Sequence, residues 1–217
     1  MEPVPHHKGR AAEFANSFTH GLGALMGVVS LVLMVVFASQ RGTARHIVGA
    51  AVFGSALVLL YTMSTLYHAF TGPRVKRVFK ILDHNAIFIL IAGTYTPLCL
   101  GALQGGWRWG ILGLIWGVAV LGIVVKSIFI GRLGWVSLAI YLGMGWIAVI
   151  AIRPLAHALP LGGLAWLFGG GLFYSLGTAF YTWKNLRFHH AIWHLFVLGG
   201  SLCHVMVVLL FVIPRAG

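Results

Sequence analysis

The chain has 217 residues, of which 59% are hydrophobic and only 8% are charged, and its mean hydropathy is +0.94. Soluble domains carry charge on about a quarter of their residues, so this composition excludes a soluble globular protein. The net charge of +12 comes from Lys and Arg in short clusters between apolar runs, the pattern that orients membrane proteins. We therefore expect no nucleic-acid binding, because no basic face is left for it.

Seven apolar runs follow one another along the chain, and a helical span of a bilayer needs about 20 such residues. The runs cover residues 18–39, 46–70, 84–103, 109–130, 134–152, 161–182 and 190–213. Short segments rich in Gly, Pro or Arg separate them, for example 71–73 and 131–132. The sequence thus predicts an all-α, polytopic membrane protein with one transmembrane domain over 1–217. It would be a seven-helix bundle preceded by a cytoplasmic N-terminal segment, 1–17.

The Lys and Arg residues predict the orientation of this bundle. With the N-terminus inside, the cytoplasmic side holds ten of them, namely Lys8, Arg10, Arg74, Lys76, Arg77, Lys80, Lys126, Arg132, Lys184 and Arg187. The opposite side holds five, namely Arg41, Arg45, Arg108, Arg153 and Arg215. Because the richer side is normally cytoplasmic, we expect a multi-pass protein of the cell (inner) membrane with its N-terminus inside.

The few ionisable residues near the apolar runs gather at one predicted membrane depth. The chain has only three acidic residues, and a carboxylate within a membrane is unfavourable unless paired and is usually functional. With alternating helix directions, five positions fall near the cytoplasmic face: His20, His68, Asp83 with the adjoining His84, His190 and His194. Glu13 also lies at or just inside the membrane. Their shared depth predicts a functional site there.

His190 and His194 lie four residues apart, which places both imidazoles on one helix face about 6 Å apart. Helical His pairs with this spacing bind zinc. A catalytic zinc takes three protein ligands and keeps one open position, and His68 is the best third ligand. Asp83 would either bind the metal or hold and deprotonate its water. The alternative is that such histidines are hydrogen-bonded packing residues, the interpretation we prefer for the deeper His204.

Two further sets of polar residues accompany these candidates. Ser64 lies one turn before His68 and would be a hydroxyl that supports the ligands, or a helix-packing residue. Glu13, Asn16 and His20 line one stripe of the first helix. They would form a polar gate or a polar layer behind the ligands, or else a helix start that caps itself at the interface. The residues alone leave both readings open. In the third run, Pro97 predicts a kink at which nearby hydroxyls satisfy freed carbonyls.

These patterns together resemble a known family. Glu13-x-x-Asn16-x-x-x-His20, Ser64-x-x-x-His68 followed by Asp83, and His190-x-x-x-His194 are similar to the signature motifs of the hemolysin III family. Gly93-Thr94-Tyr95-Thr96-Pro97 resembles another stretch of its bacterial branch. The family belongs to the progestin and adipoQ receptor superfamily, which includes the adiponectin receptors.

The resemblance implies seven helices, an N-terminus inside, zinc held by His68, His190 and His194, and Asp83 reaching the metal through water. A relationship of the superfamily to alkaline ceramidases implies hydrolysis of lipid amides.

Three functions from different classes follow. The first is a zinc-dependent hydrolase of a lipid amide or ester, linked to membrane lipid homeostasis, with Asp83 as base and Ser64 or Tyr67 as oxyanion donor. The second is a non-enzymatic sensor or regulator of lipid composition or fluidity, in which zinc staples helices. The third is a pore-forming cytolysin, which we favour least because no helix carries a polar stripe along its full length. Membrane lipids are the expected partners, with no obligate protein partner, and the sequence does not decide whether the chain is an enzyme.

Overall fold

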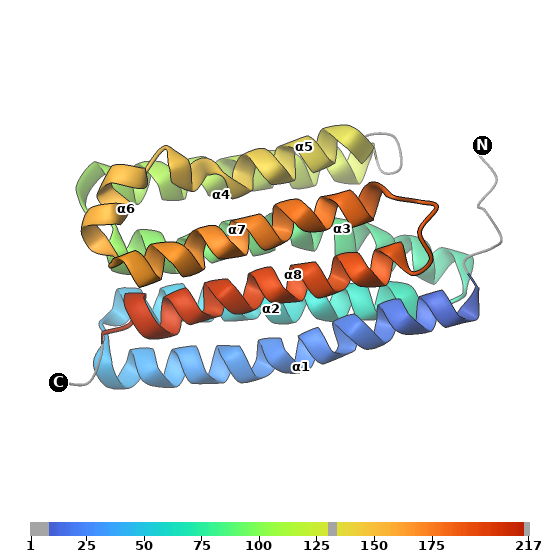
Figure 1. The fold of residues 1–217 in the computed structure, drawn as a ribbon, viewed down its shortest axis with the longest axis horizontal. Helices are drawn as coiled ribbons and strands as arrows, with labels where there is room; N and C mark the ends of the chain where they lie inside the picture. Colours follow the sequence, from blue (N-terminus) through green and yellow to red (C-terminus); the bar gives the residue numbers. More distant parts are fainter. Residues whose placement is uncertain (1–8, 130–133, 215–217) are drawn as a thin grey trace.

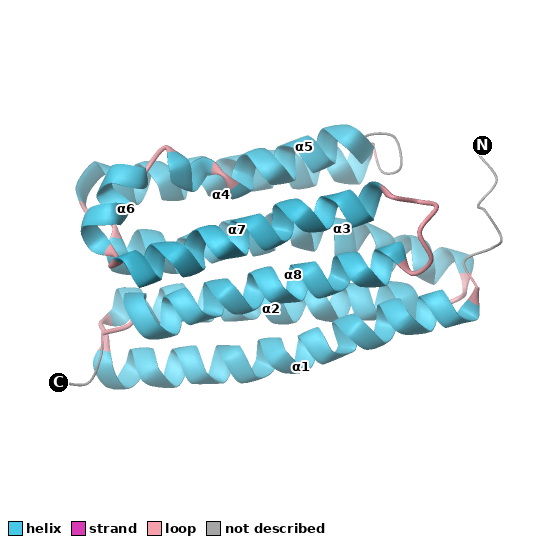
Figure 2. Ribbon diagram, in the orientation of Figure 1, coloured by secondary structure: helices cyan, strands magenta, loops and turns pink. Residues whose placement is uncertain are grey.

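The computed structural model describes residues 9–129 and 134–214, which are helical almost throughout and contain no strand (Figures 1 and 2). This confirms the predicted all-α class. Their eight α-helices are α1 (Arg10–Arg41), α2 (Ala44–Ala69), α3 (Pro73–Pro97), α4 (Gly105–Ile128), α5 (Gly134–Gly145), α6 (Ile152–Ala158), α7 (Leu161–Thr182) and α8 (His189–Val207). A 3-10 turn, Ile147–Val149, lies between α5 and α6, and π-helical segments, Leu98–Ala102 and Val208–Val212, extend α3 and α8.

The long helices lie side by side with their axes along the length of the molecule (Figure 1). α1 packs against α2 and α8, α3 packs against α2 and α4, and α7 packs against α8. The helices α1, α3 and α8 begin at the same end of the bundle, where α2 also finishes. We call this the N-terminal end, and it is the end that carries the candidate site.

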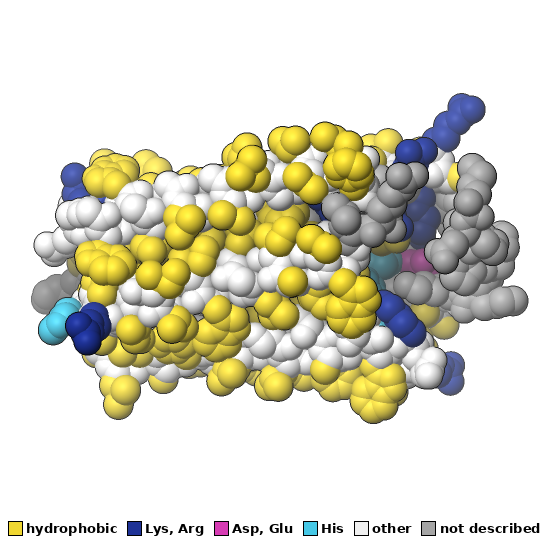
Figure 3. All heavy atoms as spheres, turned by 90° about the horizontal axis from the view of Figure 1, so that it is seen from above, with side chains coloured by type: hydrophobic (Ala, Val, Ile, Leu, Met, Phe, Trp, Pro, Cys, Tyr) yellow, Lys and Arg dark blue, Asp and Glu magenta, His cyan; other side chains and the backbone are white. Residues whose placement is uncertain are grey.

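The outer surface fits a protein surrounded by lipid. Hydrophobic side chains cover the middle of the face seen in Figure 3, and Lys and Arg lie toward its two ends. Within residues 9–129 and 134–214, five helices are long and apolar enough to cross a membrane: α1, α2, α3 and α8 with their π-helical extensions where present, and α4. The bent pair of α5 with its 3-10 turn and α6 would raise the number to six. The chain is therefore a multi-pass membrane protein. α7, which was expected as a further span, is not among these helices.

Two helices start earlier than their apolar runs. α1 begins at Arg10, so residues 10–17 of the expected N-terminal segment are helical, and α3 begins at Pro73 instead of residue 84. The predicted start of α3 was wrong because positive residues at 74–80 lower its hydropathy, whereas a proline in the first turn favours a helix start. Lys8, Arg132 and Arg215 of the charge count, and the break at 131–132, lie outside the described residues.

The apolar run at 134–152 is broken, not continuous as predicted. α6 is bent by 55° from the segment that precedes it. A break within lipid frees backbone groups that must find partners inside the protein. Tyr95 is the partner of two such groups. Its hydroxyl donates to the Gly145 carbonyl at 2.7 Å and accepts from the Ala148 amide at 2.9 Å. A side chain from α3 therefore stabilises the break.

The disturbance predicted at Pro97 takes the form of the π-helical segment that follows this residue. Upstream, Thr94 and Thr96 donate to the carbonyls of Leu90 and Ala92, four residues earlier, at 2.8 and 2.9 Å. Hydroxyls on this part of α3 thus bond to its own backbone, as expected for threonine in a membrane helix.

Glycines let α1 and α2 approach each other closely. A Cβ added to Gly27 would lie 3.1 Å from the Val58 backbone nitrogen, and one added to Gly54 would lie 2.7 Å from the Leu31 Cα. Small residues at such crossings are typical of membrane helix pairs. The tight contact fixes the register of α1 on α2, and with it the position of α1 side chains at the N-terminal end.

We expect Tyr95→Phe to lower the free energy of unfolding by about 1–3 kcal/mol, because the buried Ala148 amide and the Gly145 carbonyl lose their partner. The measurement is thermal unfolding in detergent. Tyr174→Phe is a matched control, since its hydroxyl lies 2.9 Å from Ser201 Oγ, which still receives a bond from Tyr61. Equal losses in the two variants would contradict the role assigned to Tyr95.

Candidate metal centre

The eight residues singled out in the sequence come from four helices and lie toward the N-terminal end. α1 carries Glu13, Asn16 and His20, α2 carries Ser64 and His68, α3 carries Asp83, and α8 carries His190 and His194. Asn16, His20, Ser64, His68, Asp83 and His194 are buried. Polar groups from distant parts of the sequence thus converge at one end of a mainly apolar bundle.

Three of them form the centre of this site. One ligand atom from each of His68, His190 and His194 lies within 4.8 Å of the others. Ring centroids are 4.6 Å apart for His190 and His194, and 5.0 and 5.3 Å from His68 to these two rings. Such a group can hold a metal ion. Asp83 is not a member of it.

The local structure before α8 places His190 in the first turn of that helix. Phe188, directly before α8, adopts a left-handed conformation with φ of 58°, which is uncommon for a residue with a bulky side chain. The His189 ring bonds to the Phe180 carbonyl of α7 through Nδ1 at 3.1 Å. The start of α8 is therefore tied to α7, and His194 follows one turn later on the same face.

α1 holds the outer edges of two of the rings. His68 Nδ1 donates to the Glu13 carboxylate at 2.7 Å, and Lys76 Nζ donates to its other oxygen at 3.2 Å. His194 Nδ1 donates to the Asn16 carbonyl at 3.2 Å and lies 3.0 Å from Thr19 Oγ1. With Nδ1 held from outside in both rings, Nε2 is the nitrogen that a metal would use.

The other two polar residues of this stripe also contact the rings. The Asn16 side-chain amide lies 3.4 Å from His68 Nδ1. The His20 ring stacks on that of His194, with centroids 3.4 Å apart and planes inclined by 13°. His20 is buried, and neither of its ring nitrogens makes a hydrogen bond to the described residues. The His20 ring therefore packs flat against one face of the His194 ring.

The three histidines fit a metal ion. Zinc–nitrogen distances of about 2.0–2.1 Å in a tetrahedron place neighbouring nitrogens about 3.3–3.4 Å apart. Ligand atoms within 4.8 Å of one another reach that geometry by side-chain movements of about an ångström. Imidazole nitrogens also suit zinc and related transition metals, whereas magnesium and calcium prefer oxygen. The carboxylate behind His68 is a partner that metal-binding histidines commonly have.

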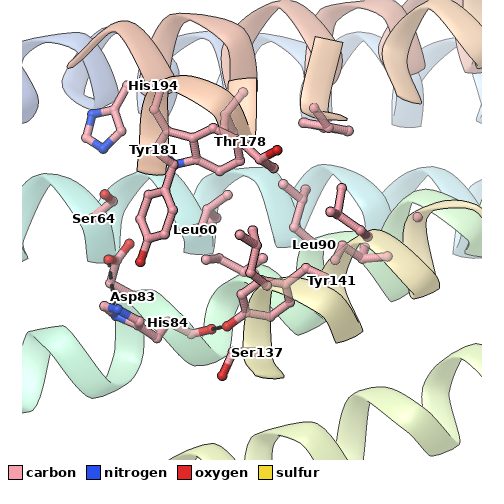
Figure 4. A pocket seen from close by; sticks show the side chains of 18 of the residues that line it. Leu60, Ser64, Asp83, His84, Leu90, Ser137, Tyr141, Thr178, Tyr181 and His194 are labelled. Atoms are coloured by element: carbon pink, nitrogen blue, oxygen red, sulfur yellow. Dashed lines mark hydrogen bonds and ion pairs between the residues drawn. The ribbon is translucent and has the colours of Figure 1, made fainter. Parts of the chain in front are cut away.

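Asp83 stands beside the histidines with two other polar groups. In Figure 4 the Ser64 hydroxyl lies next to the Asp83 carboxyl, and the Tyr181 hydroxyl points toward the same place from α7. His84 Nδ1 is 3.6 Å from Asp83 Oδ2 and 2.7 Å from the Lys80 carbonyl. The sequence alone does not single out Tyr181, because only the packing of the helices places it here, whereas His84 directly follows Asp83 in the chain.

These groups line a cavity of about 290 Å³, near the lower end of the range for ligand sites. At the N-terminal end its wall contains the three histidines with Ser64 and Asp83. Further along it is mainly apolar, lined by Leu60, Ile87, Leu90, Ile91, Leu138 and Val197. Figure 4 shows side chains of both parts around the same space. The cavity combines a polar head with an apolar body.

His204 lies in the deeper part of this cavity and not in the histidine group. Its Nδ1 donates to the Gly200 carbonyl at 2.7 Å, and its ring packs so closely on α7 that a Cβ on Gly170 would come within 2.3 Å of it. These contacts agree with the packing role preferred for His204.

The match to known proteins covers nearly the whole chain. Residues 9–205 match the family described as Haemolysin-III related. Hemolysin-3 of Bacillus cereus is 45% identical over 204 residues, which are 94% of this chain and 93% of the relative. A Hemolysin-3 homolog of Bacillus subtilis (strain 168) is 46% identical over 199 residues, or 92% and 93% of the two chains.

A more distant relative is the human monocyte to macrophage differentiation factor, 28% identical over 200 residues that cover 88% of this chain and 80% of the relative. The resemblance noted in the motifs is thus confirmed over the whole length of the bundle. The chain belongs to the haemolysin III family, within the progestin and adipoQ receptor superfamily.

Proposed function

We propose that the protein is a zinc-dependent hydrolase that cleaves an amide or ester bond in a membrane lipid. The observation that carries this proposal is the group of three histidines, with ligand atoms within 4.8 Å of one another. It stands beside Asp83 at the head of a largely apolar cavity. Ligand number, ligand type and an adjoining carboxylate match what a hydrolytic zinc site requires.

Bound zinc would supply Lewis acidity that polarises a carbonyl and makes water a better nucleophile. Asp83 accepts a proton as water adds to the acyl carbon, and it returns this proton to the nitrogen or oxygen that leaves when the acyl bond breaks. The products are a carboxylic acid and an amine or alcohol. Ser64 lies beside Asp83, where its hydroxyl orients the carboxylate. Tyr67 and Tyr181 line the same cavity and can donate to the developing oxyanion.

The substrate class follows from the lining of the cavity. An acyl chain would lie along the apolar body, among side chains such as Leu60, Leu90 and Val197, and its polar linkage would reach the histidines. The surrounding bilayer would supply lipids of this kind. Turnover of membrane lipids would connect the protein to lipid homeostasis.

A second candidate function is a regulator without turnover. The three histidines come from α2 and α8, so a shared metal would staple two helices that lie far apart in the sequence. Lipid bound in the cavity would then shift the helix arrangement. The two functions use the same metal and differ in whether Asp83 has a chemical role.

The names of the bacterial relatives would suit a cytolysin, and a pore is the candidate that the cavity favours least. None of the described arginines at the opposite end of the bundle, such as Arg45, Arg108 or Arg153, lines the cavity. With the N-terminus inside, as the Lys and Arg distribution favours, the histidines would lie near the cytoplasmic face of the cell membrane.

Purified protein should carry about one zinc per chain, and His68→Ala, His190→Ala and His194→Ala should each remove most of it, because a site needs three protein ligands. Metal analysis of the four proteins is the measurement. His204→Ala serves as a control and should keep the metal, since His204 lies outside the group. Full zinc occupancy in all three variants would end the metal assignment.

Asp83→Asn distinguishes a hydrolase from a regulator in which the metal only links α2 and α8. The amide keeps the shape of the carboxylate and an oxygen acceptor but takes no proton at neutral pH. We expect hydrolysis of a ceramide-like or acyl-ester lipid to fall by about 10²–10⁴, the usual effect of removing a general base. Zinc content and thermal stability should change little.

Two other outcomes would contradict the proposal in different ways. Loss of zinc from Asp83→Asn would make Asp83 a ligand and end its role as a base. A wild-type protein that binds zinc but hydrolyses none of these lipids, in a lipid environment that keeps it folded, would favour the regulator.

A further inference from the structure

A group of cations lines the same cavity and has no part in the proposed hydrolysis. Lys80 of α3, Lys126 of α4 and Lys184 after α7 all contribute to its wall. At this end of the molecule, Figure 3 shows Lys and Arg around the histidine and acidic side chains. A lysine inside a membrane protein is rare, usually paired with an opposite charge, and usually functional.

Lys126 is the most unusual of the three. It is 5% exposed, although it lies near the end of a helix where lysines normally extend toward water. Its Nζ donates to Ser137 Oγ at 2.9 Å, and it makes no ion pair with the described residues. An ammonium has three N–H donors. One neutral hydroxyl therefore leaves most of its charge and hydrogen-bonding capacity unmatched.

The surroundings of Lys126 add positive charge. Lys80 lies close enough to Lys126 to repel it, and the Lys80 ammonium has no ion pair among the described residues. The chain has 15 Lys and Arg but only three acidic residues. Glu13 is held by His68 and Lys76, and Asp83 lies beside His84. Neither described carboxylate pairs with Lys80 or Lys126.

From this arrangement we infer that the cavity binds an amphiphile with an anionic head, phosphate or carboxylate, placed at Lys126 and Lys80 with its chain along the apolar wall. The anion relieves the repulsion between the two ammonium groups and receives their unused N–H donors as charge-assisted hydrogen bonds. Lys184, whose Nζ donates to the Tyr181 carbonyl at 2.8 Å, adds positive charge at the cavity wall.

The inference rests on the proposed function only in its choice of cavity, and it names the substrate class more closely. Lys126 and Ser137 belong to α4 and α5, whereas the histidines belong to α2 and α8. The anionic group therefore sits on a different wall from the metal. A single-chain lipid with a negatively charged head and an acyl linkage can engage both.

The test is calorimetric titration of the purified protein, as isolated, in neutral maltoside micelles. The ligands are dodecyl phosphate, dodecanol and inorganic phosphate. We expect dodecyl phosphate to bind at least about tenfold more tightly than dodecanol, the difference that one good charged hydrogen bond provides. Inorganic phosphate should bind more weakly than dodecyl phosphate, because it lacks the chain.

Lys126→Met, which keeps the side-chain length and removes the charge, should abolish most of this preference. Lys80→Met, at a less buried position, should reduce it by about threefold or more, and provides a second variant if Lys126→Met does not fold. Arg77→Met is the matched control, because Arg77 is exposed at the same end, carries the same charge and does not line the cavity. It should bind like wild type.

Three results would overturn the inference. The first is equal affinity for dodecyl phosphate and dodecanol. The second is a preference that survives both lysine substitutions or falls equally in Arg77→Met. The third is inorganic phosphate binding as tightly as dodecyl phosphate, which would indicate a site for free oxyanions and not for a lipid. Because binding is measured and not turnover, a protein without hydrolytic activity would leave the inference intact.

Discussion

The contact between Glu13 and His68 is the interaction on which the candidate site depends. A carboxylate among apolar helices is unfavourable unless it is paired. The Glu13 carboxylate is paired, because one of its oxygens lies 2.7 Å from His68 Nδ1. The same bond orients the His68 ring and joins the start of α1 to the end of α2. Close approach of the two helices at Gly27 and Gly54 keeps these groups in register. Helix packing in the apolar part of the bundle thus positions the chemistry at its end.

α1 extends this role to α8. The Asn16 carbonyl accepts from His194, and the His20 ring stacks on it, so one helix that offers no ligand of its own supports rings on two others. Such outer contacts hold histidines ready for a metal and reduce the reorganisation that binding requires. The site is therefore preorganised on helices, a property that both a hydrolase and a structural staple would use.

Much of this could be predicted from sequence because the signals are local or depend on depth. The pair His190 and His194 follows from helical spacing, and its meeting with His68 follows from alternating helix directions. Hydropathy could not find the start of α3 at Pro73, because a helix continues beyond the lipid, nor the break after Gly145, which depends on Tyr95 from another helix. Lys126 and Tyr181 were missed as cavity residues for the same reason, since only the packing of α3, α4, α5 and α7 brings them to one space.

In the proposed site, three imidazoles from two helices share one zinc ion. X-ray absorption at the zinc edge of the purified protein tests this most directly, since it reports ligand type, number and distance together. We predict three nitrogen ligands from imidazole at about 2.0–2.1 Å and one further oxygen ligand. A spectrum with sulfur at about 2.3 Å, a shell of oxygen ligands alone, or protein free of zinc after purification without chelators would contradict it.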